Sequence, residues 1–370
     1  MLVGQALSYY DSMNLNNCVL ISLLCFLGSC LNKDNQYIFE VSDLENGTVY
    51  NETIHKLTYL EGKVLNTDSQ LVRPRSILVT NDEIILSVRR EDSLIQVLSK
   101  DGKYLRSFMR KGSGPNEAMS AMEIGLVGNR DRNENIFVYD GIKKSIFKVM
   151  PDSIAEIKLQ ELYQSVIPVD DTLLIAQGLE RVTKFSVIDY NGNILNNFGE
   201  NPEHPASNNP FILNQAYNST IKYNKSKKYL LSAAKLTDRI EFYNIDDLQL
   251  KLLIRGPVYY EPIFHEVNNN NYPTFSQNEQ GRFSFVDFVS GKETLYFLYS
   301  GYSREERPGI ANFGDKIFCF DSSGNAIAGY QLDHYLLGID VDEINGKIYG
   351  IDVDTYDEEK IIVYDLTSGH

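Results

Sequence analysis

The chain has 370 residues, 43% of them hydrophobic, which is enough to form the core of one large domain or two ordinary ones. Its 35 lysines and arginines against 50 aspartates and glutamates give a net charge of −15, which argues against nucleic acid as a partner and against electrostatic attachment to an anionic membrane. Three of the four cysteines precede residue 31, so Cys319 alone remains in the body of the chain and a disulfide framework is excluded.

An uncharged apolar run, CVLISLLCFLG, covers residues 18–28. A membrane-spanning helix needs about 20 apolar residues, so this run is too short to span a bilayer but has the length of a signal-peptide core. The run ends in Leu27-Gly28-Ser29-Cys30, which resembles the lipobox of bacterial lipoproteins. The resemblance implies that the Cys30 thiol is acylated with diacylglycerol and that the chain is cut just before it.

We therefore predict a signal peptide over residues 1–29, a tether over residues 30–53 and a folded domain over residues 54–370. Leu31, which is not aspartate, resembles the signal for sorting to the outer membrane. The segment before the apolar run lacks Lys and Arg, unlike most lipoprotein signals. A translation start at Met13 instead of Met1 would give the signal peptide a typical length. The alternative is that the apolar run forms a strand or helix of the folded domain.

The rest of the chain reads as short β-strands that repeat. Runs of Ile, Leu, Val, Phe and Tyr alternate with Asn, Asp and Gly, and only residues 116–124 suggest a turn of helix. Pairs of runs recur about every 53 residues between Ile84 and Ile348. The first runs cover 83–88, 135–140, 172–177, 228–233, 294–300 and 347–352, and the second runs cover 93–102, 145–153, 184–192, 239–247, 316–324 and 360–369.

Each pair of runs has further candidate strands on either side. An inner strand is expected before each pair, over residues 75–80, 122–128, 165–170, 213–221, 282–288 and 335–342. A fourth strand is expected over residues 103–108, 193–198 and 325–332, after turns in which Gly102, Gly192 and Gly324 supply positive φ. Four strands in each of six repeats predict an all-β fold, a six-bladed β-propeller of four-stranded antiparallel blades.

The two ends of this domain are expected to close the ring. The sixth repeat stops just after its third strand, while an extra strand, HKLTYLEG over residues 55–62, precedes the first complete blade. Pairing residues 55–62 with residues 361–366 would complete the last blade and leave no open sheet edge.

This pattern resembles the six-bladed TolB-like propeller lipoproteins, which are relatives in shape of NHL-repeat propellers. The likeness covers residues 37–370 and is carried by the lipobox, the strand over residues 55–62 and the segment over residues 94–117. Within that segment, residues 112–117 look like the Gly-x-Gly-Pro-Gly-Glu loop of the family, with Asn116 in place of a glycine. The resemblance implies a fold and a location in the cell envelope more than an activity.

No catalytic or metal-binding signature is found in the sequence. The glycine-rich loop lacks phosphate-binding spacings, the five histidines lack zinc spacings, and Cys319 lies in an apolar run typical of a buried, unreactive thiol. The acidic segment over residues 340–359 does not fit an EF-hand, although a structural Ca²⁺ there remains an alternative. We expect no cofactor, no catalytic residue and no metal site.

Candidate ligand-binding residues lie at the expected starts of the inner strands, at one mouth of the channel. They are Arg73, Arg75, Glu123, Arg282, His334 and Tyr335. The arginines could face an anionic group such as a sugar acid, or they could pair with carboxylates of neighbouring blades. The aromatic and amide-rich insertion over residues 255–280 is either a second binding element or a solvated lid.

The leading functional hypothesis is a lipid-anchored binding or interaction module of the bacterial cell envelope. Its expected partner is a protein, peptide or glycan, its only membrane contact is the lipid, and it would face the periplasm or the cell surface. The first alternative is a carbohydrate lyase or hydrolase that uses Arg75 and His334 at the channel mouth. The second is a scaffold subunit of an envelope complex, which would expose a large apolar patch.

Overall fold

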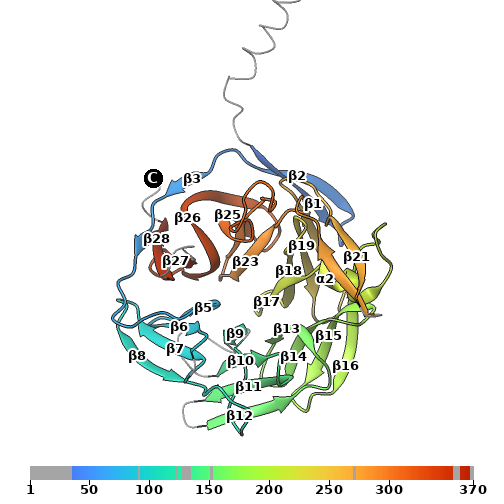
Figure 1. Cartoon of the computed structure of the whole chain (residues 1–370). Helices are drawn as coiled ribbons and strands as arrows, with labels where there is room; N and C mark the ends of the chain where they lie inside the picture. The colour runs from blue at the N-terminus through green and yellow to red at the C-terminus, as the bar shows by residue number, and fades with distance from the viewer. Residues whose placement is uncertain are drawn as a thin grey trace, which may run out of the picture. The chain divides into compact units, whose positions relative to one another are not determined.

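Antiparallel strands make up nearly all the regular structure of residues 36–90, 92–121, 123–126, 135–150, 153–269, 272–352 and 359–366, which are the residues described in this computed structural model. Within them the strands of the compact unit that begins at Tyr37 form six blades around a central channel. Figure 1 looks along this channel, with β5, β9 and β17 at the centre and β8, β12 and β16 at the periphery. The expected all-β propeller of four-stranded antiparallel blades is confirmed.

The first three blades are separate sheets in which four consecutive strands run from the channel outward. Blade 1 contains β5 Ser76–Val79, β6 Glu83–Ser87, β7 Ile95–Ser99 and β8 Tyr104–Phe108. Blade 2 contains β9 Glu123–Leu126, β10 Ile136–Asp140, β11 Ser145–Met150 and β12 Ser153–Lys158. Blade 3 contains β13 Tyr163–Pro168, β14 Leu173–Gly178, β15 Thr183–Asp189 and β16 Ile194–Glu200.

Blade 4 is enlarged at its outer edge. Its own strands are β17 Ser219–Asn224, β18 Tyr229–Ala234, β19 Arg239–Asn244 and β20 Leu250–Arg255. The N-terminal hairpin of β1 Tyr37–Asp43 and β2 Thr48–Ile54 then extends this sheet, because β1 pairs with β20. The expected tether over residues 30–53 is therefore wrong from Tyr37 onward, where the chain is already part of the folded unit.

Blades 5 and 6 share one long strand. Blade 5 contains β23 Phe285–Ser290, β24 Thr294–Tyr299 and β25 Gly314–Asp321, and blade 6 contains β27 Lys347–Asp352 and β28 Lys360–Asp365. The 17-residue β26, Ala326–Asp342, pairs first with β25 and then with β27. The strands expected separately over residues 325–332 and 335–342 are thus one continuous strand, which is the outer strand of blade 5 and the inner strand of blade 6.

The ring is closed by the segment after the hairpin, although the pairing differs from the prediction. β3 Thr58–Leu60, within the expected closing strand, pairs in parallel with β26 instead of β28. The next residues form β4 Lys63–Val64, which pairs with Ile362 and Val363 of β28 and completes blade 6. An N-terminal strand does complete the last blade, but it lies one step farther along the chain.

In the described part of the chain, one helix and one hairpin lie outside the blades. The helix α2, Pro210–Ala216, begins after Asn209, whose side chain accepts a hydrogen bond from the Phe211 N–H and caps the helix. This helix occupies the first part of the strand expected over residues 213–221, so the inner strand β17 begins only at Ser219. The hairpin of β21 Phe264–Asn269 and β22 Tyr272–Gln277 packs against α2 through Phe264 and Phe275. Residues 116–121 form no helix.

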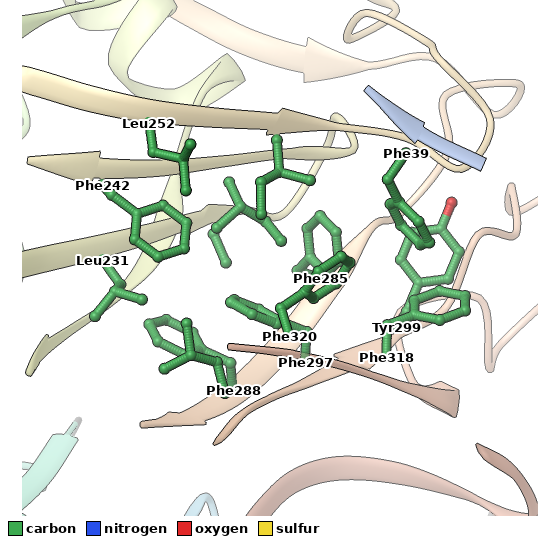
Figure 2. Packing of buried hydrophobic residues seen from close by; sticks show 14 of the residues in the cluster. Phe39, Leu231, Phe242, Leu252, Phe285, Phe288, Phe297, Tyr299, Phe318 and Phe320 are labelled. Carbon is green, nitrogen blue, oxygen red and sulfur yellow. The ribbon is translucent and has the colours of Figure 1, made fainter. Parts of the chain in front are cut away.

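The core consists of six apolar layers, one between each pair of neighbouring blades. Strands buried on both faces contribute alternate residues to two layers: Ile84 and Leu86 pack toward blade 6, whereas Ile85 packs toward blade 2. This double burial explains why the strands read as continuous apolar runs. The layer between blades 4 and 5 is the most aromatic, and Figure 2 shows Phe39 of β1 facing rings of blade 5.

Candidate functional site

The ends of the inner strands enclose a cavity of about 700 Å³ in the central channel. Its wall consists of the whole of the short β9, the last residues of β5, β13, β17, β23 and β26, and the turns that follow several of these strands. All six blades contribute to the wall, so the cavity lies in the central channel. Because the turns after the inner strands belong to the wall, the cavity lies at the face of the ring where these strands end. Its volume falls within the range of ordinary small-ligand sites.

Carboxylates on the inner strands join neighbouring blades around the cavity. The Val79 N–H of blade 1 donates to Asp340 Oδ2 of blade 6 at 2.6 Å, and the Ile339 N–H of blade 6 donates to Asp287 Oδ2 of blade 5 at 3.1 Å. Each carboxylate thus accepts a hydrogen bond from a backbone N–H group on the inner strand of the following blade, an edge strand whose channel-facing N–H groups would otherwise lack a partner. These contacts tie blade 6 to blades 1 and 5 at the cavity wall.

Opposite charges on and beside the cavity lining interact across the channel. Glu123 of blade 2 accepts a hydrogen bond from the Ser165 hydroxyl and interacts electrostatically with Lys222 and Lys235 of blade 4. Burial raises the pKa of Glu123 and of Asp287 and lowers the pKa of Lys235, because each charged form loses water, while the opposite charges nearby counteract these shifts. Glu123 and Lys222 lie deep in the ring yet keep accessible surface, since they line the cavity.

Lysines dominate the rim where the turns of blades 4 and 5 meet. Lys225 follows β17 and Lys292 follows β23, and both are exposed residues of the cavity lining. The two turns are joined by a hydrogen bond of 3.0 Å from Asn224 Nδ2 to Ser290 Oγ. On the neighbouring turn of blade 6, Glu343 accepts the Lys292 backbone N–H at 2.7 Å.

Of the six residues predicted from the sequence, Glu123 alone lines this cavity. Arg282 forms a bidentate ion pair with Glu306 and also donates to the Gly301 carbonyl. It therefore pairs with a carboxylate, but with one of its own blade instead of a neighbouring blade. His334 Nδ1 lies 3.2 Å from Asp352 Oδ2, and the Tyr335 ring lies 5.2 Å from the guanidinium of Arg307.

The other two, Arg73 and Arg75, are exposed residues just before β5. Arg75 and His334, on which the enzyme alternative depends, are both absent from the cavity lining.

The sequence interpretation missed the lysines of the cavity because it chose the other end of the inner strands. Lys222, Lys225 and Lys292 lie at or just after the ends of β17 and β23, in runs rich in Asn, Ser and Lys that mark the turns. The polar turn that follows each inner strand was the available signal. None of the described residues of the insertion over 255–280 lines the cavity, and β21 and β22 pack beside α2.

Some predictions fall outside the residues that the structure describes. They include the lipobox, Cys30 and residues 353–358 of the acidic segment. Among the described side chains, no group of three or more His, Cys, Asp or Glu is placed to hold a metal ion. In the same part of the chain, no helix has the length and apolar character needed to cross a bilayer.

Residues 21–344 match the family model described as TolB-like 6-blade propeller-like. A Bacteroides fragilis protein whose name marks it as a candidate exported protein aligns at 12% identity over 82% of this chain and 94% of its own, with a TM-score of 0.52. A member of the DUF4221 family from Bacteroides vulgatus aligns at 9% identity over 84% and 98% of the two chains, also with a TM-score of 0.52. At these identities the likeness concerns the fold. A comparison with curated proteins gives no match.

Proposed function

Because the chain belongs to the TolB-like six-blade propeller family, we propose that it is a binding module of the bacterial cell envelope whose ligand enters the central cavity. The observation that carries the proposal is the cavity of about 700 Å³ whose wall is tied together by carboxylates of neighbouring blades. A preorganised wall reduces the ordering cost of binding. The partner is a glycan, a peptide or an exposed segment of an envelope protein.

The proposed location rests on the sequence. Leu27-Gly28-Ser29-Cys30 supports a diacylglycerol anchor on Cys30 and, with Leu31, placement in the outer membrane. The name of the Bacteroides fragilis neighbour, a candidate exported protein, agrees with export of this chain. With an acidic net charge of −15, the lipid would be the sole membrane contact.

A substitution that fills the cavity mouth tests the binding proposal. Ile344 lines the mouth and is 74% exposed, so Ile344→Trp adds bulk there without removing a buried contact. The matched control is Val182→Trp, at a position 76% exposed on blade 3 and outside the cavity lining. Native mass spectrometry of co-purified material selects the envelope glycans and peptides to test, and calorimetry measures their affinity for each variant. We expect a ligand whose affinity falls at least about tenfold in Ile344→Trp and is unchanged in Val182→Trp.

Binding that is equal in both tryptophan variants would contradict the proposed site. Absence of any bound or titratable ligand would contradict the binding proposal itself.

Mass spectrometry of the protein from the native membrane fraction tests the anchor. We expect a chain that begins at diacylated Cys30, and a Cys30→Ser variant that is neither processed nor lipidated. An unmodified Cys30 within an intact N-terminus would refute the anchor while leaving the cavity proposal standing.

A further inference from the structure

We infer that the central cavity recognises its ligand through a carboxylate, which Lys225 and Lys292 bind at the rim. This inference rests on the proposed function, because it names the ligand chemistry of the same cavity. It concerns the face where the inner strands end, opposite the arginines considered from the sequence.

The two lysines lie on neighbouring turns of the cavity rim. They follow inner strands of adjacent blades, and the hydrogen bond from Asn224 to Ser290 fixes the distance between their turns. Both are exposed, and neither forms a close ion pair among the described residues, although Lys225 interacts electrostatically with Asp170. An anion held between them would gain two charged donors.

The carboxylates of the lining already have protein donors. Asp340 accepts the backbone N–H groups of Val79 and Val341, and Asp342 accepts from Lys100 and from Asn345. Glu123 accepts from Ser165, and Glu343 accepts the Lys292 backbone N–H. A cationic ligand would have to compete with these donors, whereas an anionic ligand would form new bonds with the two lysines.

The charge balance favours a single negative charge over a phosphate or a polyanion. The cavity lining holds Lys222, Lys225 and Lys292 against four carboxylates, those of Glu123, Asp340, Asp342 and Glu343, so it offers no large excess of positive charge to a polyanion. The protein as a whole carries −15, which repels polyanions. Lysine ammonium groups are compact point charges that suit a carboxylate without a guanidinium fork.

Acids and their neutral amides provide matched probes for the two sources of such a carboxylate. D-glucuronate and D-glucuronamide represent a sugar acid, whereas N-acetyl-Ala-Ala and its C-terminal amide represent a peptide terminus. Each is titrated by calorimetry into the wild type, into the double variant Lys225→Gln/Lys292→Gln and into the control Lys227→Gln. Lys227 is an exposed lysine of the same turn that does not line the cavity, so it controls for charge.

We expect at least one acid to bind about five- to tenfold tighter than its amide, since exposed ion pairs contribute about 0.2–1 kcal/mol each. The double variant should lose this preference for the acid, whereas Lys227→Gln should keep it. Salt at about 0.5 M NaCl should weaken the preference, because it screens exposed ion pairs. Preference for glucuronate alone identifies a sugar acid, and preference for the acidic peptide alone identifies a chain terminus.

Equal binding of acid and amide, a preference that survives in the double variant, or failure of both acids to bind overturns the inference. The proposed function is tested separately, by comparing the binding of the co-purified ligand to Ile344→Trp and to Val182→Trp.

Discussion

A buried ion network joins the third strands of blades 3 and 4. Lys184 Nζ of β15 lies 2.6 Å from Glu241 Oε2 of β19, and both side chains are 1% exposed. Arg239 donates to the other oxygen of Glu241 at 2.7 Å. The two cations lower the pKa of Glu241 although its burial acts in the opposite direction. Removing the carboxylate would leave the ammonium of Lys184 buried without its counter-ion.

We therefore predict that Glu241→Gln lowers the free energy of unfolding by about 3 kcal/mol, as expected for a broken buried ion pair. Urea denaturation followed by circular dichroism measures the loss. The control is Asp246→Asn, which removes the exposed Lys228–Asp246 pair of the same blade, with side chains 59% and 64% exposed. That change should cost about 0.5 kcal/mol or less. Equal costs in the two variants would contradict a structural role for the buried network.

The same variant has a pH dependence of known sign. A carboxyl whose folded-state pKa is lowered contributes stability above its unfolded pKa and loses it as the pH falls through the folded value. The difference between the wild type and Glu241→Gln should therefore be full at neutral pH. It should shrink as the pH falls below about 4, the usual pKa of a glutamate in the unfolded chain, and disappear once the pH has passed the lowered pKa of folded Glu241. A difference that stays constant down to pH 3 would exclude ionisation of Glu241 as the cause.

At the scale of elements, the β1–β2 hairpin covers the aromatic layer between blades 4 and 5. Phe39 is fully buried, and its ring centroid lies 5.1 Å from that of Phe318 and 5.0 Å from that of Phe320, in edge-on contacts (Figure 2). Both partners lie on β25 of blade 5, whereas β1 is hydrogen-bonded to β20 of blade 4. The hairpin therefore bridges the two blades.

Phe39→Ala should destabilise the protein by about 3–5 kcal/mol, because it removes a buried ring and leaves a cavity. Val49→Ala, on the neighbouring strand β2 at a position 65% exposed, is the matched control and should cost about 0.5 kcal/mol or less. Both values come from urea unfolding. A small cost for Phe39→Ala would show that the hairpin adds little to the folded unit, as the tether prediction implied.

The sequence predicted best the elements that belong to the repeat. Double burial makes each blade strand an apolar run, and the turn glycines Gly102, Gly192 and Gly324 have φ of +90°, +80° and +88°, as expected. The β1–β2 hairpin was missed because it belongs to no repeat and its strands alternate in polarity only weakly. The helix α2 was missed because its seven residues are too few to show helical periodicity.

The candidate site could be predicted only in part, for a physical reason. Glu123 was found because it stands at the expected start of an inner strand, and β9 is so short that its first residue also lines the cavity. Strand periodicity does not reveal which end of a strand borders the wider part of the channel, since that depends on how six blades tilt together. The lysines at the ends of β17 and β23 therefore looked like ordinary turn residues.

At the scale of the whole molecule, a short segment closes the ring. Gly62 lies between β3 and β4, and its N–H donates to the carboxylate of Asp333 at 3.1 and 3.0 Å. A Cβ at this position would lie 2.2 Å from Ile362 of β28, so glycine permits the close approach of the N-terminal segment to the last blade. The ladder then continues through the Leu65 N–H, which donates to the Ile361 carbonyl at 2.8 Å.

Leu65→Pro removes that N–H and should open the closure, with a loss of about 1–3 kcal/mol beyond that of Leu65→Ala. The alanine variant loses the side chain that packs on the layer between blades 6 and 1 but keeps the hydrogen bond, so it isolates the backbone contribution. Urea unfolding gives the free energies, and limited proteolysis with mass spectrometry should show earlier cleavage before residue 65 in the proline variant. Equal stability and equal cleavage of the two variants would mean that this strand pair does not hold the ring shut. The closure would then depend on the apolar layer between blades 6 and 1 alone.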